Sequence, residues 1–190
     1  MNILFILILS LLARSTYAAQ DSLKRISIFG SYWGDSPKKV HKIATESLGL
    51  AMMEIEYASL SPRQDSFEDH LSYSGGSWHS YKASWWNFEF YHDSLYSHLI
   101  GFDATQNSSI FELYRAIVDS VTKDLNCNGT EFRNSLKNEL TTQWTFGVNG
   151  TVEESVSIRM DNKYHRVYVE YIYVPLLEAH KKQWIKTKDR

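Results

Sequence analysis

Three groups of side chains in this sequence are of types that could carry out chemistry. Glu89 and His98 fall on the two strands of a predicted hairpin, where a carboxylate could orient an imidazole that acts as a general base. The loop from Asp65 to His70 contains three carboxylates and an imidazole, which could hold a divalent cation. Cys127 is the single cysteine, and its thiolate could act as a nucleophile.

None of these groups has a pattern that fixes a catalytic geometry. Glu89 and His98 are better explained as a polar pair across two strands, and the loop from Asp65 to His70 as a solvated acidic loop. Gly-x-Ser-x-Gly, a phosphate-binding glycine loop and His-Glu-x-x-His are all absent from the sequence. We therefore expect no catalytic residue, no metal site, no cofactor and no enzymatic activity. The alternative is a small envelope hydrolase that uses Glu89 and His98, or a metal held by the loop.

Aromatic side chains are unusually frequent, at 14% of the sequence with 6 Trp and 12 Tyr. A core of this size needs fewer, so some rings are expected at the surface, where Tyr and Trp make good contacts. Alternation over residues 85–99, with a turn at Asp93-Ser94, predicts two strands whose core face includes Trp86, Phe88 and Phe90. A long loop or a chain terminus could cover the rings of the opposite face. The binding residues predicted for that open face are Trp85, Tyr91, Tyr96, His98 and Tyr168.

The N-terminal residues indicate export. Residues 2–12 are almost wholly apolar and are followed by Ala18-Ala19, so residues 1–19 are predicted to be a secretory signal peptide. A membrane-retained N-terminus is the alternative; no later segment is predicted to span a membrane. With a single cysteine the mature chain forms no internal disulfide, which favours a bacterial periplasmic or secreted location over a eukaryotic extracellular one.

The charge balance bears on the partner. The net charge is -2, from 20 basic and 22 acidic residues, and no basic stripe is present to neutralise phosphates. This argues against a nucleic-acid partner. A protein partner is expected instead, with a homodimer formed through the same face as a further reading.

The elements that position these residues are clearest at the C-terminal end. Alternating apolar and polar residues predict three antiparallel strands from Thr141 to Val174. Turn chemistry at Asn162-Lys163 predicts a register in which Met160 faces His165. A second turn at Asn149-Gly150 predicts Trp144 opposite Val156.

The remaining elements repeat this layout. Residues 37–48 are predicted to form a helix that Ser36 caps, and residues 110–125 a second helix with Ser109 and Glu112 as a capping box. Residues 59–77 are expected to form a long loop, and short helices are expected at 131–140 and 175–184. The mature chain, residues 20–190, is thus predicted to be one α+β domain. It is a two-layer sandwich with a pseudo-repeat of helix plus three strands (37–102 and 110–174), an antiparallel sheet of six or seven strands and two main helices on one face.

A short motif and this layout resemble known envelope proteins. Phe29 to Val40, with Trp33-Gly34-Asp35-Ser36-Pro37, resembles the segment of small bacterial periplasmic proteins in which a strand, a Trp-Gly turn and a capped helix precede an antiparallel sheet. The tandem layout is similar to the β-lactamase inhibitory protein fold and, as a single unit, to the small outer-membrane assembly lipoproteins. Those families bind proteins and are not enzymes. The resemblance implies an exported, non-catalytic protein-binding module, such as an inhibitor or an immunity protein of the bacterial envelope.

Overall fold

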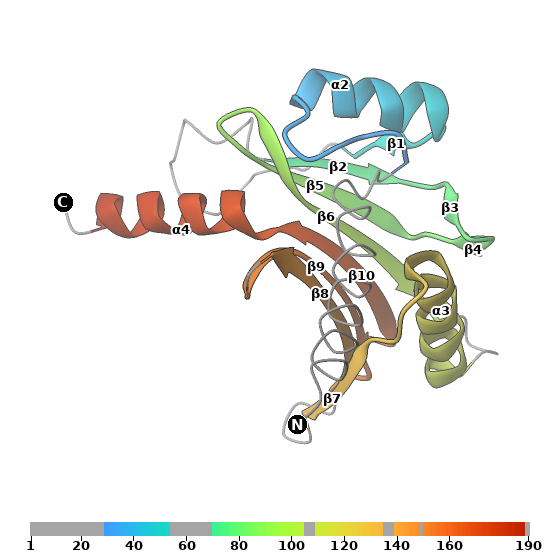
Figure 1. The fold of residues 1–190 in the computed structure, drawn as a ribbon. Helices are drawn as coiled ribbons and strands as arrows, with labels where there is room; N and C mark the ends of the chain where they lie inside the picture. The colour runs from blue at the N-terminus through green and yellow to red at the C-terminus, as the bar shows by residue number, and fades with distance from the viewer. Residues whose placement is uncertain (1–28, 54–69, 105–108, 135–138, 149, 189–190) are drawn as a thin grey trace, which may run out of the picture.

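The computed structural model describes residues 29–53, 70–104, 109–134, 139–148 and 150–188 (Figure 1). The predicted signal peptide lies outside the described residues, as does the part of the acidic loop from Asp65 to Asp69. The fold is α+β, with an open antiparallel sheet that contains eight strands within the described residues.

The sheet has the strand order β1-β2-β5-β6-β10-β9-β8-β7, and every neighbouring pair is antiparallel. A separate two-stranded ribbon is formed by β3 (Ser77–Trp78) and β4 (Tyr81–Lys82). The strands of the main sheet are β1 (Ala51–Met52), β2 (His70–Ser74), β5 (Trp85–Tyr91), β6 (Ser94–Asp103), β7 (Thr130–Asn134), β8 (Glu139–Val148), β9 (Thr151–Asp161) and β10 (Arg166–Tyr173).

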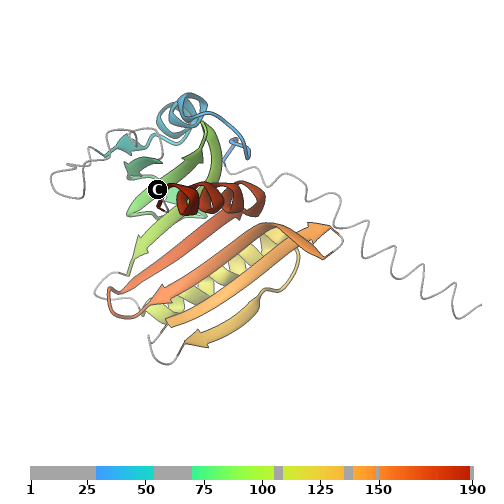
Figure 2. The same ribbon diagram turned by 90° about the vertical axis from the view of Figure 1, so that its left-hand side faces the viewer.

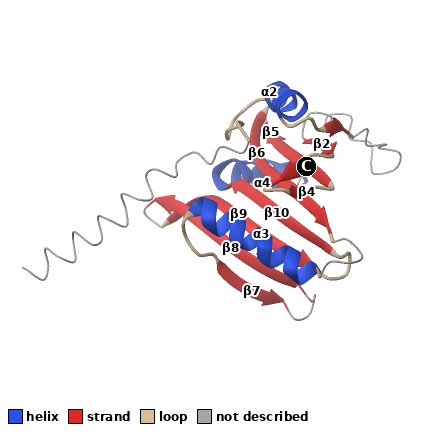
Figure 3. Ribbon diagram, turned by 90° about the vertical axis from the view of Figure 1, so that its right-hand side faces the viewer, coloured by secondary structure: helices blue, strands red, loops and turns tan. Residues whose placement is uncertain are grey.

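The helices lie on both sides of this sheet. α2 (Pro37–Lys42), extended by the π-helical turn η1 (Ile43–Ser47), and α3 (Ile110–Leu125) are on one side. α4 (Val174–Lys188) continues from β10 and lies on the other side. Figure 2 shows α4 in front of the sheet and α3 behind it, and Figure 3 shows the reverse. The sheet therefore has a face covered by α2 and α3, and an open face on which α4 lies across one end.

The chain builds the sheet from two similar halves. In each half a helix is followed by four strands, β1-β2-β5-β6 after α2 and β7-β8-β9-β10 after α3. Across the sheet, the strands of the second half follow in the reverse of their chain order. The last strands of the two halves, β6 and β10, therefore pair at the centre of the sheet. Each half has one strand more than the sequence predicts.

The additional strands lie in segments to which the sequence analysis assigned other structures. β2 occupies the end of the predicted loop at 59–77, where Leu71 and Tyr73 alternate with serines. β7 replaces the helix predicted at 131–140, and all five of its residues are exposed. Because β7 is an edge strand held by backbone hydrogen bonds to β8, it has no buried side chains whose spacing could reveal a period of two.

Other local predictions are confirmed. Ser36 is the N-cap of α2, its hydroxyl accepts a hydrogen bond from the Lys39 amide at 3.4 Å, and a proline occupies the first turn. Trp144 pairs with Val156 in the β8/β9 ladder. Ser109 is the N-cap of α3, but its side chain makes no capping hydrogen bond, so the predicted capping box does not form.

The predicted register of the β9/β10 hairpin is wrong by two residues. Met160 pairs with Val167 and not with His165, because the turn is longer than predicted. The Asp161 carboxylate accepts hydrogen bonds from the amides of Lys163 and Tyr164, at 2.9 and 3.2 Å, and thereby stabilises the longer turn. A shift of two residues leaves the side chains that pair in this ladder on their predicted faces.

Helices α2 and α3 are each held to the covered face by a hydrogen bond to a side chain of the sheet. The two sheet residues, Tyr73 and Thr142, are the ends of one row of side chains that crosses the strands. The Tyr114 hydroxyl of α3 lies 2.6 Å from the Thr142 hydroxyl, and His41 Nδ1 of α2 lies 2.9 Å from the Tyr73 hydroxyl. Between Tyr73 and Thr142 the row consists of buried side chains that pack on one another. Its members, from β2 to β8, are Tyr73, Trp86, Ile100, Val169, Ile158 and Thr142.

We expect the Tyr114–Thr142 hydrogen bond to contribute to stability because both groups are buried. Tyr114→Phe leaves the Thr142 hydroxyl without this partner and should lower the free energy of unfolding by about 1–2 kcal/mol, measured by urea titration. Tyr164→Phe, at a ring that is 57% exposed, is the control and should have no measurable effect. Equal effects of the two substitutions would contradict the assignment.

Candidate functional site: the open face of the sheet

One extra residue in β6 decides which side chains reach the open face. The β5/β6 hairpin turns at His92-Asp93, both with positive φ, and Phe90 pairs with Leu95. Glu89 pairs with Ser97, so Tyr96 is the extra residue of a β-bulge. Beyond the bulge the alternation inverts relative to the prediction.

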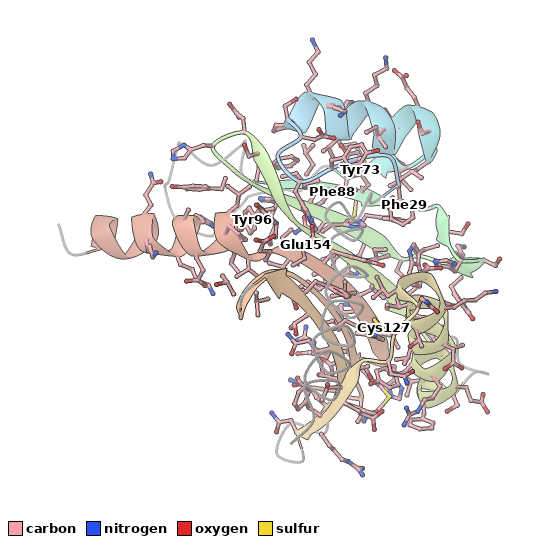
Figure 4. The ribbon with its side chains drawn as sticks, in the orientation of Figure 1. Phe29, Tyr73, Phe88, Tyr96, Cys127 and Glu154 are labelled. Carbon is pink, nitrogen blue, oxygen red and sulfur yellow. The ribbon has the colours of Figure 1, made fainter. Side chains whose placement is uncertain are left out.

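His98 therefore points to the covered face, contrary to the sequence prediction. It pairs with Phe88, and its side chain is fully buried. Its ring lies 4.5 Å from the Phe88 ring and 5.6 Å from the Trp86 ring, centre to centre, and is stacked on both. Phe29 packs against it edge-on. Figure 4 shows Phe29, Tyr73 and Phe88 grouped between α2 and the sheet. His98 is a core residue.

The predicted pairing of Glu89 with His98 is wrong for the same reason. Glu89 follows Phe88 in the strand and points to the open face, so the sheet lies between its carboxylate and the His98 imidazole. Neither His98 ring nitrogen has a hydrogen-bond partner among the described residues, and burial lowers the pKa of His98 to about 3. The imidazole is neutral in the folded protein over the physiological range.

The buried imidazole predicts that stability falls in mild acid. An unfolded histidine has a pKa near 6.5 and binds a proton that the folded chain excludes, so stability is complete above pH 6.5 and declines below it. At pH 5 the loss should be about 2 kcal/mol relative to pH 8, measured by denaturant titration.

The matched variant is His98→Leu, which should remove this part of the pH dependence whatever its stability at pH 8. In the unsubstituted protein, the NMR signals of the His98 ring should report a neutral imidazole down to pH 5. Protonation of the His98 ring in the folded protein near pH 6.5 would contradict the prediction.

The open face carries a row of side chains that we call the aromatic strip, defined as Arg159, Tyr168, Gly101 and Trp85. These residues are direct partners across β9, β10, β6 and β5. The Arg159 guanidinium lies 4.9 Å from the centre of the Tyr168 ring, and the Tyr168 and Trp85 ring centres are 5.9 Å apart. A cation and two rings thus form one continuous contact surface over four strands.

Gly101 provides the space for the Trp85 ring. A Cβ at position 101 would lie 2.3 Å from two atoms of the indole, so the ring sits directly over the backbone of β6. Trp85 and Tyr168 are both half-buried, and Arg159 is exposed. The rings are held in place by neighbours while part of their surface faces solvent.

Two carboxylates lie near the aromatic strip on the same face, Glu170 in the next row and Glu89 one row further. Glu170 is half-buried, and its pKa is raised by burial and by the charge of Glu89, against the opposing effects of Arg159 and a hydrogen bond from Ser157. The Ser157 hydroxyl lies 3.4 Å from the Glu170 carboxylate. The open face therefore combines exposed ring surface and a cation with nearby acidic groups.

The other two aromatic residues predicted for this face lie against α4. The Tyr91 hydroxyl donates a hydrogen bond to Gln183 Oε1 at 2.7 Å, and the ring contacts His180. Tyr96 is 5% exposed, with its hydroxyl 3.2 Å from His180 Nδ1. Tyr96 is therefore covered by the C-terminal helix, which is the alternative that the sequence left open for these rings, and it does not take part in an exposed surface. Of the predicted set, the structure brings together Trp85 and Tyr168.

Two members of the aromatic strip were missed by sequence reasoning. Arg159 faces Tyr168 only in the observed register of β9 and β10, which the Asp161 turn shifts by two residues. Gly101 lies within a strand, where a glycine marks a close approach by another group. That signal was present in the sequence and could have pointed to the position of Trp85.

Other chemical candidates find no support in the described part of the chain. No group of three or more His, Cys, Asp or Glu residues there is arranged to hold a metal ion, although Asp65–Asp69 lie outside it. Cys127 is exposed in the turn after α3, where its carbonyl accepts a hydrogen bond from the Trp144 indole at 3.0 Å. Among the described helices, none is long and apolar enough to cross a membrane.

Comparisons with known proteins found no match: no family model, no curated protein and no solved structure is similar to this chain.

The contact between Gly101 and Trp85 predicts a specific non-additivity. Gly101→Ala forces the indole to move and should destabilise the protein by about 1–2 kcal/mol. In a Trp85→Ala background the same change should be neutral or stabilising, because alanine lowers the entropy of the unfolded chain relative to glycine. Urea titrations of the four proteins measure the coupling; an equal cost in both backgrounds would contradict the contact.

Proposed function

We propose that this protein is an exported, non-catalytic binding module that recognises a protein partner through the open face of its sheet. The observation that carries the proposal is the aromatic strip, in which Arg159, Tyr168 and Trp85 form a preorganised and partly exposed surface. Tyr, Trp and Arg are the residue types that most often dominate the energy of protein interfaces.

The form of this surface favours a protein over a small ligand. The aromatic strip crosses four neighbouring strands. It is therefore a broad surface of the kind that protein partners cover, and not the concave pocket that a small ligand needs. Figure 2 shows that α4 lies across one end of the open face, where it contacts β5, β6, β9 and β10, and leaves the rest of that face uncovered by any described helix. Because the rings are already packed against neighbours, binding a partner would cost little of their side-chain entropy.

The polar surroundings add specificity to this contact area. Arg159 presents a cation, and Glu89 and Glu170 present carboxylates on the same face, so a partner needs a complementary pattern of charges. Such a surface fits an inhibitor or an immunity protein that blocks a target in the bacterial envelope. That part of the proposal follows from the resemblance of the tandem layout to the β-lactamase inhibitory protein fold and from the predicted signal peptide.

The test is capture of the partner by the mature chain, residues 20–190, from an envelope extract, followed by titration of the purified pair. Trp85→Ala and Tyr168→Ala should each weaken binding by about 2 kcal/mol, or about 30-fold, because central aromatic residues dominate interface energy. Phe111→Ala is the control: its ring is 46% exposed on α3, on the opposite side of the sheet from the aromatic strip, and its loss should not change the affinity.

Two results would contradict the proposal. A partner that binds the Trp85→Ala and Tyr168→Ala variants as tightly as the unsubstituted protein would use another surface. Retention of no protein, together with a mass that rises with concentration in sedimentation analysis, would show that the open face serves self-association.

A further inference from the structure

A second site lies at the end of the sheet, where the Trp33-Gly34-Asp35 turn meets the C-terminal half. The amide of Gly34 donates to the Leu95 carbonyl and the amide of Leu95 donates to the Asp35 carbonyl, both at 3.0 Å. Gly34 has a φ of +87°, which favours glycine at this position. The turn is thereby fixed to the start of β6.

From this turn Trp33 reaches across to the other half of the fold. Its indole Nε1 donates a hydrogen bond to Glu154 Oε1 of β9 at 3.0 Å, and its ring is stacked on Tyr173 of β10 with 6.2 Å between ring centres. A cavity of about 740 Å³ lies between these elements, a size typical of small-molecule sites. Its charged lining residues are Asp35, Lys39, Glu153 and Glu154.

Glu154 lines this cavity with an unsatisfied oxygen. The residue is 5% exposed, and its Oε2 is buried with no hydrogen-bond partner among the described residues. Burial raises the pKa of Glu154; the Trp33 hydrogen bond lowers it in part, and the neighbouring charge of Glu153 raises it further. A buried carboxyl oxygen without a partner is costly and is rare in native structures. Its position beside a cavity indicates that a ligand completes the site.

The charges around the cavity indicate the sign of that ligand. Three carboxyl groups line it, from Asp35, Glu153 and Glu154, and Lys39 is the one basic residue in the lining. The Lys39 ammonium is already paired with the Asp35 carboxylate at 2.9 Å. Within the described residues, Glu153 and Glu154 therefore have no cation that neutralises them.

We infer that this cavity binds a small organic cation through an ammonium or guanidinium group, with Glu154 as its counter-ion and the Trp33 and Tyr173 rings as its walls. The rings provide apolar surface for the body of such a ligand and a favourable quadrupole for its charge. Glu154 lines the cavity, and a charge-assisted hydrogen bond from the ligand would satisfy its unpaired oxygen. This site is separate from the aromatic strip and does not depend on the proposed function.

The test compares charged probes with neutral probes of the same shape. Phenethylammonium and butylguanidinium are titrated into the mature chain, with phenethyl alcohol and butylurea as controls, and binding is measured by calorimetry. The indole N–H signal of Trp33, assigned in the NMR spectrum with Trp33→Phe, reports whether the probe occupies this cavity. We expect at least one cation to saturate the site and shift that signal, and to bind at least tenfold tighter than its neutral analogue.

Variants separate recognition from a purely structural role of the carboxyl. Glu154→Gln keeps a hydrogen-bond acceptor for Trp33 and should weaken cation binding at least tenfold. Glu112→Gln, at an exposed carboxylate on α3, should leave it unchanged. Trp85→Ala should also leave it unchanged, so failure here and failure of the proposed function are distinguishable.

The inference would be overturned by the absence of saturable binding of both cations at 10 mM and below, on the order of the weakest affinities usual for specific sites. It would equally be overturned by neutral probes that bind as well as the cations, or by Glu154→Gln leaving the affinity unchanged. Should Glu154→Gln fail to fold, Glu153→Gln and the Trp33 signal of the unsubstituted protein decide between the outcomes.

Discussion

The antiparallel pairing of β6 with β10 is the constraint on which the rest of the structure depends. These are the last strands of the two halves, and among the described strands their ladder alone joins the halves into one sheet. Ile100 and Phe102 of β6 and Val167 and Val169 of β10 are each at most 1% exposed, so separating the halves would expose a continuous apolar surface. The same ladder sets Tyr168 opposite Gly101 and so completes the aromatic strip.

In β6, one bulge residue decides which side chains lie on each face. Until Tyr96, the alternation of β5 and β6 follows the simple rule that successive side chains point to opposite faces. The extra residue reverses the assignment of everything after it in β6, and so places His98 in the core and Leu99 on the open face. A bulge leaves no mark in the hydrophobic pattern when the inverted residues are a histidine and a leucine, since neither type excludes burial. Sequence reasoning therefore identified the strands but not the side that His98 faces.

Elsewhere, an element could be predicted when its buried side chains or its capping residues form a recognisable pattern in the sequence. The α3 helix has a buried apolar face at helical spacing, and α2 has a capping serine followed by proline, so both could be read from the sequence. The edge strand β7 buries nothing and could not. In the aromatic strip, Trp85 and Tyr168 could be predicted from alternation, whereas Arg159 required the register that the Asp161 turn determines.

The aromatic strip and the Glu154 cavity both span the junction between the halves. The strip joins β5 and β6 of the first half to β9 and β10 of the second, and the Trp33 indole joins the first half to Glu154 of β9. Any ligand that binds only the assembled junction stabilises it in proportion to the logarithm of its concentration relative to Kd. Occupation of either surface thus favours the same β6/β10 pairing that creates the other. If the halves separate to any measurable extent, the two surfaces are coupled with the same sign, and by linkage each ligand strengthens the binding of the other to an equal degree.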